Sequence, residues 1–504
     1  MNAASAAICA RSSSEADSRG FFGFPDKVRL ALEATPILEI SMRRSSALHK
    51  TSPLPAVFVP PYNLFMTTSP WTIHGLRHQL ATEALRPTAL AAEALANSNR
   101  NPSHNTFLWQ DAAWTRSEAV RVEAMPRDSG SPFEEGGTAL WGLPISVKDC
   151  FDLAGAPTSC GVHFYRDLHG TALRDSWLVE QLRASGAVIT GKTHLHPLAY
   201  GITGENPEFG DCLRPGNPPS LTGGSSSGAA ASVLEGSAVA AIGTDTGGSI
   251  RAPAALCGLA GYRATLGLGD WRGGAHLAES FDTMGWLFRD LEDGPLLASL
   301  FAPPHPAPQP GFTRFAVVAE AFLHDCEPEI ATCFHATIRE LEALGLELRT
   351  IDAGWWAEST EVFAHIQAWE AARLHAGHFD RIEPAIRERL EMGARITPNE
   401  ISVLRRRHAD FRARMDEVLA ANQLLVLPCV PVARLAAGAD HSKTRGRLLR
   451  YTTPFSLAGV PVVAIPCATG GMQLGAPRGS DEPLLQLAAQ LGARRKASAP
   501  PSGA

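Results

Sequence analysis

One glycine- and serine-rich stretch, Thr222 to Gly258, constrains the fold of this chain more than any other feature; it reads TGGSSSGAAASVLEGSAVAAIGTDTGGSIRAPAALCG. It holds two loops of small residues, 223–228 and 243–249, separated by an alanine-rich segment and a short apolar run. The alanine-rich segment predicts a helix with Gly236 as its C-terminal stop, and the apolar run predicts a buried strand over 237–242. The stretch therefore predicts a loop, a helix, a strand and a second loop in close succession.

The two loops come close together if the strand runs back alongside the helix. A helix of about ten residues spans roughly 15 Å and a strand of about six residues roughly 20 Å, so the second loop returns to the level of the first. Ser225 and Ser249 then face each other. The glycines before Ser249 allow a sharp turn that points amide N–H groups into one concavity. A hydroxyl beside such amides offers a nucleophile with an oxyanion hole, which acyl transfer requires.

The nucleophile also needs a base, and the stretch contains no histidine or lysine. Upstream, residues 142–149 read GLPISVKD, an apolar run that predicts a buried strand ending at Lys148. Lysine is scarce in this chain, which carries most of its positive charge on arginine. Burial lowers the pKa of a lysine, so Lys148 can be neutral and accept a proton. Taken alone, Lys148 could equally be a strand-end lysine that reaches solvent.

GTDTGGSIR at 243–251, with GGSS about two dozen residues upstream, resembles the signature of the amidase signature family, the serine hydrolases with a Ser–cis-Ser–Lys triad. The resemblance covers roughly Trp71 to Gly492. It implies that Lys148 is the base, Ser225 the bridging cis serine and Ser249 the nucleophile.

The same resemblance implies the surroundings of the triad. Asp245 and Arg251 match a structural ion pair near the second loop. Three departures from the family pattern are Ser227 in place of glycine, Arg263-Ala264 in place of Lys-Pro, and His194 in place of asparagine. None touches the triad, so they bear on the pocket walls. The implied oxyanion hole consists of the backbone amides of Thr246, Gly247, Gly248 and Ser249.

Two short patterns point to other chemistry, and their contexts argue against both. Residues 186–193 fit the phosphate-loop pattern, but the residues between the two glycines are apolar or β-branched and predict a strand instead of a cradle of amides. Residues 224–228 fit the nucleophile-elbow pattern centred on Ser226. An elbow follows a hydrophobic strand, and 217–222 predicts none.

Aspartic-protease and metal chemistry are also disfavoured. The sequences DTG at 245–247 and DSG at 128–130 mimic a pair of catalytic aspartate loops, but a polar flank and many helical segments do not suit that fold. His194 and His196 place two imidazoles on one face of a possible strand, yet no HExxH motif or cysteine cluster supplies a third zinc ligand. We expect no metal and no cofactor.

Composition sets the remaining limits. The net charge of −6 gives no electrostatic footprint for nucleic acid or an anionic membrane, and no run of eighteen apolar residues predicts a transmembrane helix. The nine cysteines include no CxxC pair, which favours reduced thiols in a cytoplasm. We expect a cytoplasmic monomer or homodimer that acts on a small-molecule amide.

The resemblance implies an α/β/α sandwich, with one large mixed β-sheet flanked by helices. We expect residues 66–492 to form this amidase signature domain. Residues 1–65 mix Ala, Ser, Arg and Pro without a signal-peptide pattern, and predict a disordered, dispensable extension. The polar, proline-containing residues 493–504 predict a disordered tail.

Periodicity and turn signals predict the other elements. Residues 126–137 predict a loop, 280–285 a turn and 302–311 a linker, and 205–206 and 217–218 are expected to help line the site. The predicted strands are 107–109, 187–190, 315–318, 424–428 and 461–466. The predicted helices are 72–97, 111–125, 175–185, 290–300, 327–344, 361–375, 384–392 and 398–421, the last behind a capping box at Thr397.

The predicted function is hydrolysis of a carboxylic amide through an acyl-enzyme on Ser249, with esters and carbamates as further substrate classes in the family. The alternative is the glutaminase component, the A subunit, of a tRNA-dependent amidotransferase complex, which shares the signature. The departure at Arg263 and the residues after the serine loop argue against that alternative. A catalytically dead binding protein is a third reading, and an intact triad argues against it.

Overall fold

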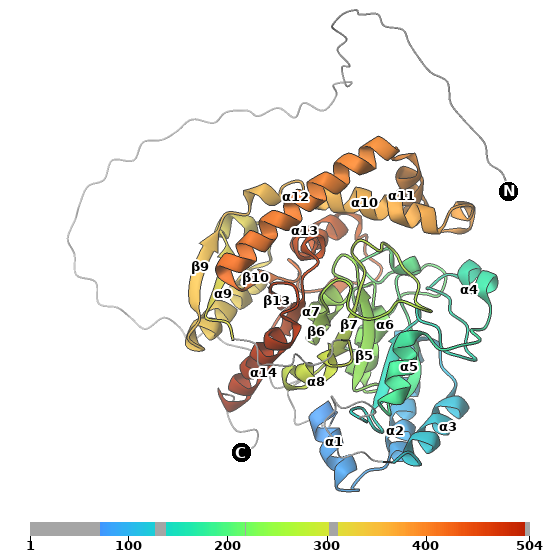
Figure 1. Cartoon of the computed structure of the whole chain (residues 1–504). Helices are drawn as coiled ribbons and strands as arrows, with labels where there is room; N and C mark the ends of the chain where they lie inside the picture. The colour runs from blue at the N-terminus through green and yellow to red at the C-terminus, as the bar shows by residue number, and fades with distance from the viewer. Residues whose placement is uncertain (1–70, 127–137, 217, 302–310, 499–504) are drawn as a thin grey trace, which may run out of the picture. The chain divides into compact units, whose positions relative to one another are not determined.

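The computed structural model describes residues 71–126, 138–216, 218–301 and 311–498 (Figure 1). The expected extension over 1–65 and most of the predicted loop and linker lie outside the described residues. Predictions about those segments stay predictions.

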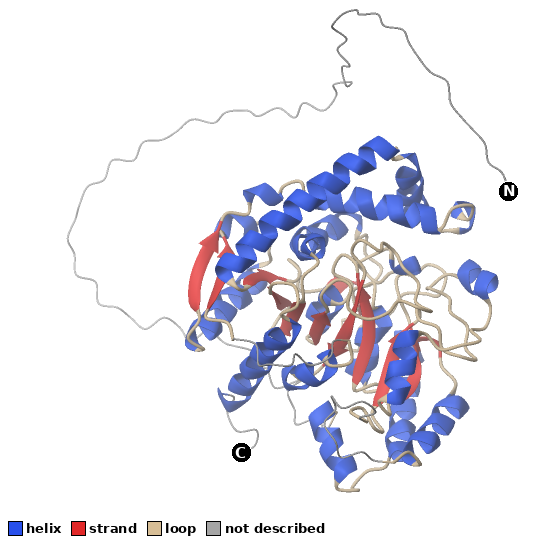
Figure 2. Cartoon of the chain, in the orientation of Figure 1, coloured by secondary structure: helices blue, strands red, loops and turns tan. Residues whose placement is uncertain are grey.

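A mixed sheet of eleven strands runs through the middle of the described chain, in the order β1-β3-β2-β5-β7-β6-β12-β13-β10-β8-β9 (Figures 1 and 2). Strand β2 is parallel to both of its neighbours, β3 and β5, and β8 is parallel to β10 and β9. The strands from β5 to β10 pair antiparallel in the order given. The strands of this sheet are β1 (Phe107–Trp109), β2 (Pro144–Lys148), β3 (Val188–Thr193), β5 (Ala240–Asp245), β6 (Ala260–Arg263), β7 (Thr283–Phe288), β8 (Arg314–Val318), β9 (Glu347–Ile351), β10 (Leu425–Pro428), β12 (Val462–Pro466) and β13 (Gly471–Gly475).

Helices lie on both sides of the strands (Figure 2), which confirms the α/β/α sandwich. None of the helices in the described part of the chain has the length and apolar composition that a membrane span requires. The helices are α1 (Ile73–Ala81), α2 (Pro87–Arg100), α3 (Ala112–Glu123), α4 (His163–His169), α5 (Trp177–Ala184), α6 (Ser227–Glu235), α7 (Arg251–Cys257), α8 (Gly294–Ala298), α9 (Pro328–Ala343), α10 (Ser359–Leu374), α11 (Pro384–Arg395), α12 (Pro398–Asn422), α13 (Ser442–Ala458) and α14 (Asp481–Ser498).

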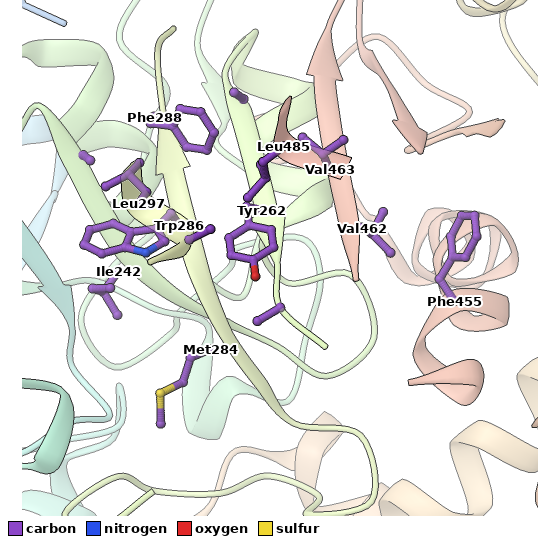
Figure 3. Close-up of a cluster of buried hydrophobic side chains, with 14 of the residues drawn as sticks. Ile242, Tyr262, Met284, Trp286, Phe288, Leu297, Phe455, Val462, Val463 and Leu485 are labelled. Carbon is purple, nitrogen blue, oxygen red and sulfur yellow. The ribbon is translucent and has the colours of Figure 1, made fainter. Parts of the chain in front are cut away.

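The middle of the sheet is buried on both faces, as parallel and mixed strands covered by helices require. Every residue of β2, β3, β5, β6 and β7 is buried. Large side chains from these strands, among them Trp286, Tyr262 and Phe288, pack in one cluster with Leu297 and Leu485 from helices (Figure 3). Burying each such side chain contributes about 1.5–3 kcal/mol, so the strands that carry the site are firmly held.

Two predicted helices differ from the structure. The apolar pattern over 72–97 is divided between α1 and α2, because Pro87 has no N–H to continue a helix and instead begins α2. The helix predicted over 290–300 is a short 3-10 turn, Leu291–Asp293, followed by α8. Just before it, residues 283–285 belong to strand β7, so the predicted turn over 280–285 is wrong in its second half.

The strand predicted over 237–242 lies further along the chain, as β5, and includes the first part of the second loop. Its backbone is paired with β7 as far as Asp245, and this long-range pairing extends the strand through residues that locally favour a turn. A two-residue strand, β4 (Ser220–Leu221), occupies part of 217–222, where the sequence predicts no strand. It pairs with β11 (Leu435–Ala436), outside the main sheet.

The tail predicted from residue 493 is helical as far as Ser498, so the prediction is wrong over 493–498. The end of α14 is tied down by ion pairs, Arg495 to Glu340 at 2.7 Å and Lys496 to Glu292 at 2.9 Å. Charged side chains with partners on other elements hold a helix that its composition alone does not predict. Residues 499–504 lie outside the described residues.

Candidate active site

The two glycine–serine loops lie side by side, as predicted. The Ser226 amide donates a hydrogen bond to the Ser249 carbonyl at 3.2 Å, and the Ser226 hydroxyl donates to the Thr244 carbonyl at 3.3 Å. Helix α6 begins at Ser227, within the last part of the first loop, and is capped at its C-terminus by Gly236, whose φ of 78° is a left-handed stop. Helix α6 and strand β5 therefore bring the second loop back next to the first.

Lys148 ends β2 beneath these loops. Its Nζ lies 2.7 Å from the Ser225 hydroxyl oxygen and 2.7 Å from the Thr244 hydroxyl oxygen. The side chain is 0% exposed, and burial lowers the pKa of Lys148 to about 8. At physiological pH this lysine is still mainly protonated, but its neutral form, the form that accepts a proton, is far more populated than in an ordinary lysine. The contact with Thr244, on β5, does not follow from the sequence pattern.

Two members of the predicted triad, Lys148 and Ser225, are hydrogen-bonded to each other. The third, Ser249, lies in the second loop, whose backbone is hydrogen-bonded to the first loop at Ser226. The peptide bond between Gly224 and Ser225 is cis. Within the described residues, the Ser249 hydroxyl makes no hydrogen bond, so a direct contact with the Ser225 hydroxyl stays a prediction. Ser249 is 5% exposed and lines a narrow cavity with Tyr200 and Leu449. The cavity is small, about 10 Å³, so a substrate larger than a water molecule needs the surrounding side chains to move.

The four predicted oxyanion-hole amides differ in whether they already donate a hydrogen bond within the protein. The Gly248 amide donates to the Asp245 carboxylate at 2.8 Å, so it is engaged and closed to a substrate oxygen. The amides of Thr246, Gly247 and Ser249 have no acceptor among the described residues. The candidate oxyanion hole therefore narrows to three amides, because the Asp245 side chain uses the fourth to hold the loop.

Asp245 is the anchor of the second loop. The predicted ion pair with Arg251 is confirmed at 2.9 Å, and Arg263 approaches the same carboxylate at 3.0 Å. All three side chains are 0% exposed. Burial raises the pKa of Asp245, but Arg251 and then Arg263 outweigh burial and bring it below its usual value. Arg263, which in the sequence is only a departure from the family pattern, is thus a second arginine in a buried cluster.

Two side chains from distant segments fix the backbone of the loop. Thr246 donates its hydroxyl hydrogen to Asp282 at 2.6 Å, and Asp282 also accepts the Leu277 amide at 2.8 Å. On the other side, the Thr452 hydroxyl donates to the Gly247 carbonyl at 2.5 Å. Sequence reasoning misses both Asp282 and Thr452, because nothing local in the sequence links them to the loop.

Glycine is required at two positions of the loop. A Cβ on Gly247 would lie 2.7 Å from the ring of Phe363. Gly248 has a φ of +121°, and a Cβ there would lie 2.8 Å from Thr452. The free amides of the loop exist because the chain turns where side chains cannot fit.

The competing motifs have ordinary structural roles. Residues 188–193 form the buried strand β3, so the phosphate-loop pattern provides no cradle of amides. Ser226, the centre of the elbow pattern, is 0% exposed, and its hydroxyl is used within the loop. His194 Nε2 donates to the Gly210 carbonyl at 2.8 Å, and burial lowers the pKa of His194 to about 4. In the described ranges, no group of three His, Cys, Asp or Glu side chains is placed to hold a metal.

Residues 205 and 206, which were expected to help line the site, have different surroundings. Glu205 lines a cavity with His196 whose lining does not include Ser249, so its place at the site stays a prediction. Asn206 is 1% exposed, and its side-chain amide donates to the Gly161 and Leu195 carbonyls, so it braces the backbone. Residue 217 lies outside the described residues.

Known proteins resemble this chain over most of its length. A family model described as Amidase matches residues 92–485. The indoleacetamide hydrolase of Pseudomonas syringae pv. syringae is 30% identical over 449 residues, 82% of this chain and 96% of that protein. The A subunit of the glutamyl-tRNA(Gln) amidotransferase of Thermosynechococcus vestitus is 30% identical over 454 residues, 80% of this chain and 92% of that protein.

The fold has solved relatives as well. A crystal structure of an amidase has a TM-score of 0.75 and 29% identity, covering 84% of this chain and 99% of its own. The family match spans well over half of the chain and includes every residue of the proposed triad and loop. The chain therefore belongs to the amidase family.

Proposed function

We propose that the protein hydrolyses a carboxylic amide through an acyl-enzyme on Ser249. The observation that carries the proposal is the buried lysine: Lys148 Nζ lies 2.7 Å from the Ser225 hydroxyl, directly below a loop with three free amides. A neutral amine, a hydroxyl relay and free amide donors are the parts that acyl transfer needs. Family membership, and relatives named as amide hydrolases, support the same chemistry.

The proposed reaction follows from these positions. Neutral Lys148 accepts a proton from Ser225 as Ser225 takes the proton of Ser249, and the Ser249 oxygen attacks the carbonyl carbon. The amides of Thr246, Gly247 and Ser249 donate to the oxyanion of the tetrahedral intermediate. The intermediate collapses, and the departing amine receives the proton back through Ser225. Water then attacks the acyl-enzyme by the same relay and releases the carboxylic acid.

The glutaminase component of a tRNA-dependent amidotransferase is the second candidate, because proteins of that name are among the relatives. The two candidates differ in what they need. An amide hydrolase acts alone, as a monomer or homodimer on a small-molecule amide, whereas an amidotransferase component works on glutamine as part of a complex. Size-exclusion chromatography with a glutaminase assay separates them, since efficient glutamine hydrolysis only with added partner subunits would favour the second.

The test of the proposed function is ammonia release from a panel of primary amides, together with labelling by a fluorophosphonate probe. We expect ammonia release from at least one amide and a single labelled serine. Absence of both labelling and amide hydrolysis would contradict the proposal.

A further inference from the structure

Two cavities share one lining residue, Arg445. The narrow cavity that holds Ser249 is lined by Arg445 on α13, together with Tyr200. A second cavity of about 540 Å³ is also lined by Arg445, and by Arg389 on α11. Arg445 therefore faces both the cavity of Ser249 and the larger cavity.

Neither Arg389 nor Arg445 forms an ion pair within the described chain, whereas the buried Arg251 and Arg263 are both paired with Asp245. The Arg445 Nε and one terminal nitrogen of Arg389 are shielded from solvent without a hydrogen-bond partner. Burial, and then the neighbouring Arg389, lower the pKa of Arg445 to about 10, so two cations face each other in a poorly solvated place. Such charges are costly unless a ligand supplies the opposite charge.

Of the two arginines, only Arg389 has carboxylates among the groups that raise its pKa, those of Glu383 and Glu388. The four acidic side chains that line the larger cavity keep their charges, but none forms an ion pair with either arginine. Each is committed to a hydrogen bond with its own surroundings: Glu205 accepts from Thr203, Asp211 from the Asn206 amide, Glu383 from the Ala385 amide and Asp440 from the Ser442 amide. The Arg389 side chain is itself held in place, since Nε donates to the Ala385 carbonyl at 3.0 Å and the guanidinium lies 4.5 Å from the centre of the Tyr200 ring.

We propose that Arg445, supported by Arg389, binds a carboxylate of the substrate, so that the enzyme acts on amides that carry an anionic group a short arm away from the scissile carbonyl. A guanidinium suits this task because its planar donors match a carboxylate in two parallel hydrogen bonds. This inference rests on the proposed function at Ser249 and names its substrate class. A charge-assisted contact of this kind favours the charged substrate about 10- to 100-fold.

The experiment compares matched pairs of amides that differ in one group. The monoamides of malonic, succinic and glutaric acid are each measured against the neutral amide with a methyl in place of the carboxylate, for example succinamate against butyramide. We expect kcat/KM to be about 10- to 100-fold higher for at least one charged member than for its neutral match. Equal or better turnover of every neutral match would overturn the inference.

The variant Arg445→Met tests whether any preference for the charged amide over its neutral match depends on this arginine. It should reduce the preference to a few-fold by lowering kcat/KM mainly for the charged amide, and Arg445→Lys should keep part of the preference. Arg447→Met is the matched control, since Arg447 lies on the same helix and is paired with Asp325. A preference that survives in Arg445→Met would also overturn the inference.

Labelling of Ser249 by a fluorophosphonate distinguishes a failure of the anion subsite from a failure of the proposed function. If Arg445→Met is labelled like the parent protein, it is folded and its kinetics count. A parent protein that is labelled but shows no preference for the charged amides contradicts the anion subsite alone. One that is neither labelled nor active contradicts the proposed function. Should Arg445→Met fail to fold, the comparison of substrates in the parent protein still decides.

Discussion

The Lys148 amine lies 2.7 Å from the Ser225 hydroxyl oxygen, and no water-accessible surface of the lysine remains. A lysine in this position has exchanged its hydration for two hydroxyl partners, Ser225 and Thr244. Burial favours its neutral form, and the neutral form is a base. The chemistry of the site thus depends on burying a residue type that proteins usually leave at the surface.

Replacing Lys148 by arginine should abolish activity as fully as replacing it by alanine. Arginine keeps its proton at any workable pH, so it cannot accept one from Ser225. We expect kcat/KM to fall about 10²- to 10⁴-fold or more in both variants. Lys443→Arg, at the exposed start of α13, is the control and should keep full activity. Substantial amide hydrolysis by Lys148→Arg would show that another group is the base.

The pH dependence of the reaction should report the lysine. Because burial lowers the pKa of Lys148 to about 8, kcat/KM should rise with pH through about 8 and level off above it. Between about 8 and the ordinary value of 10.5 the unfolded chain binds more protons at this site than the folded one, so this lysine makes stability rise with pH over that window.

Thr244→Val tests the assignment of that pH profile. The substitution removes an oxygen that accepts a hydrogen bond from the charged amine, so the pKa should fall and the midpoint should move to lower pH. A profile with no midpoint between about pH 6.5 and 9.5, or an unmoved midpoint in Thr244→Val, would contradict the role given to Lys148.

The sequence predicted the strand of Lys148 and the two loops better than the side chains that support them. The strand that ends at Lys148 and the two loops were predictable, because each combines a local apolar run with glycines at a turn. Asp282 and Thr452 were not, since each reaches the loop from a segment far along the chain. Pairing between β5 and β7 likewise converted predicted loop residues into strand.

Several elements that the sequence did not predict are likewise explained by contacts between distant segments. Strands β6, β9 and β13 and helix α13 follow no strong local pattern, and their partners in the sheet or the bundle define them. Helix α13 also brings Arg445 to Ser249, a neighbour almost two hundred residues away in sequence. No periodicity in one sequence encodes such a contact.

Asp245→Asn should destabilise the protein strongly. The change leaves Arg251 and Arg263 as buried cations without a neutralising carboxylate, and breaking a buried pair typically costs about 3–5 kcal/mol. Glu180→Gln removes the exposed ion pair with Arg272 and should cost far less stability, because solvent screens exposed charges. Chemical denaturation of both variants measures the difference. Equal losses would show that the buried cluster does not anchor the loop.

Gly247→Ala should lower activity far more than stability. A Cβ at this position would lie 2.7 Å from Phe363, so the loop must shift and displace a free amide. Loss of one oxyanion donor typically lowers kcat about 10²- to 10³-fold. Gly446→Ala, on α13 with nothing within 4 Å of the added Cβ, should be as active as the parent. Normal kcat in Gly247→Ala would remove that amide from the oxyanion hole.

The identity of the acylated serine tests the central claim most directly, because two motifs name different residues. Ser226 is fully buried with its hydroxyl engaged, whereas Ser249 lines a cavity beside free amides. A fluorophosphonate probe followed by peptide mapping should label Ser249. Ser249→Ala should abolish labelling and activity together, Ser225→Ala should slow both, and Ser226→Ala should keep the labelled position. Label on Ser226, or label that persists in Ser249→Ala, would contradict the mechanism.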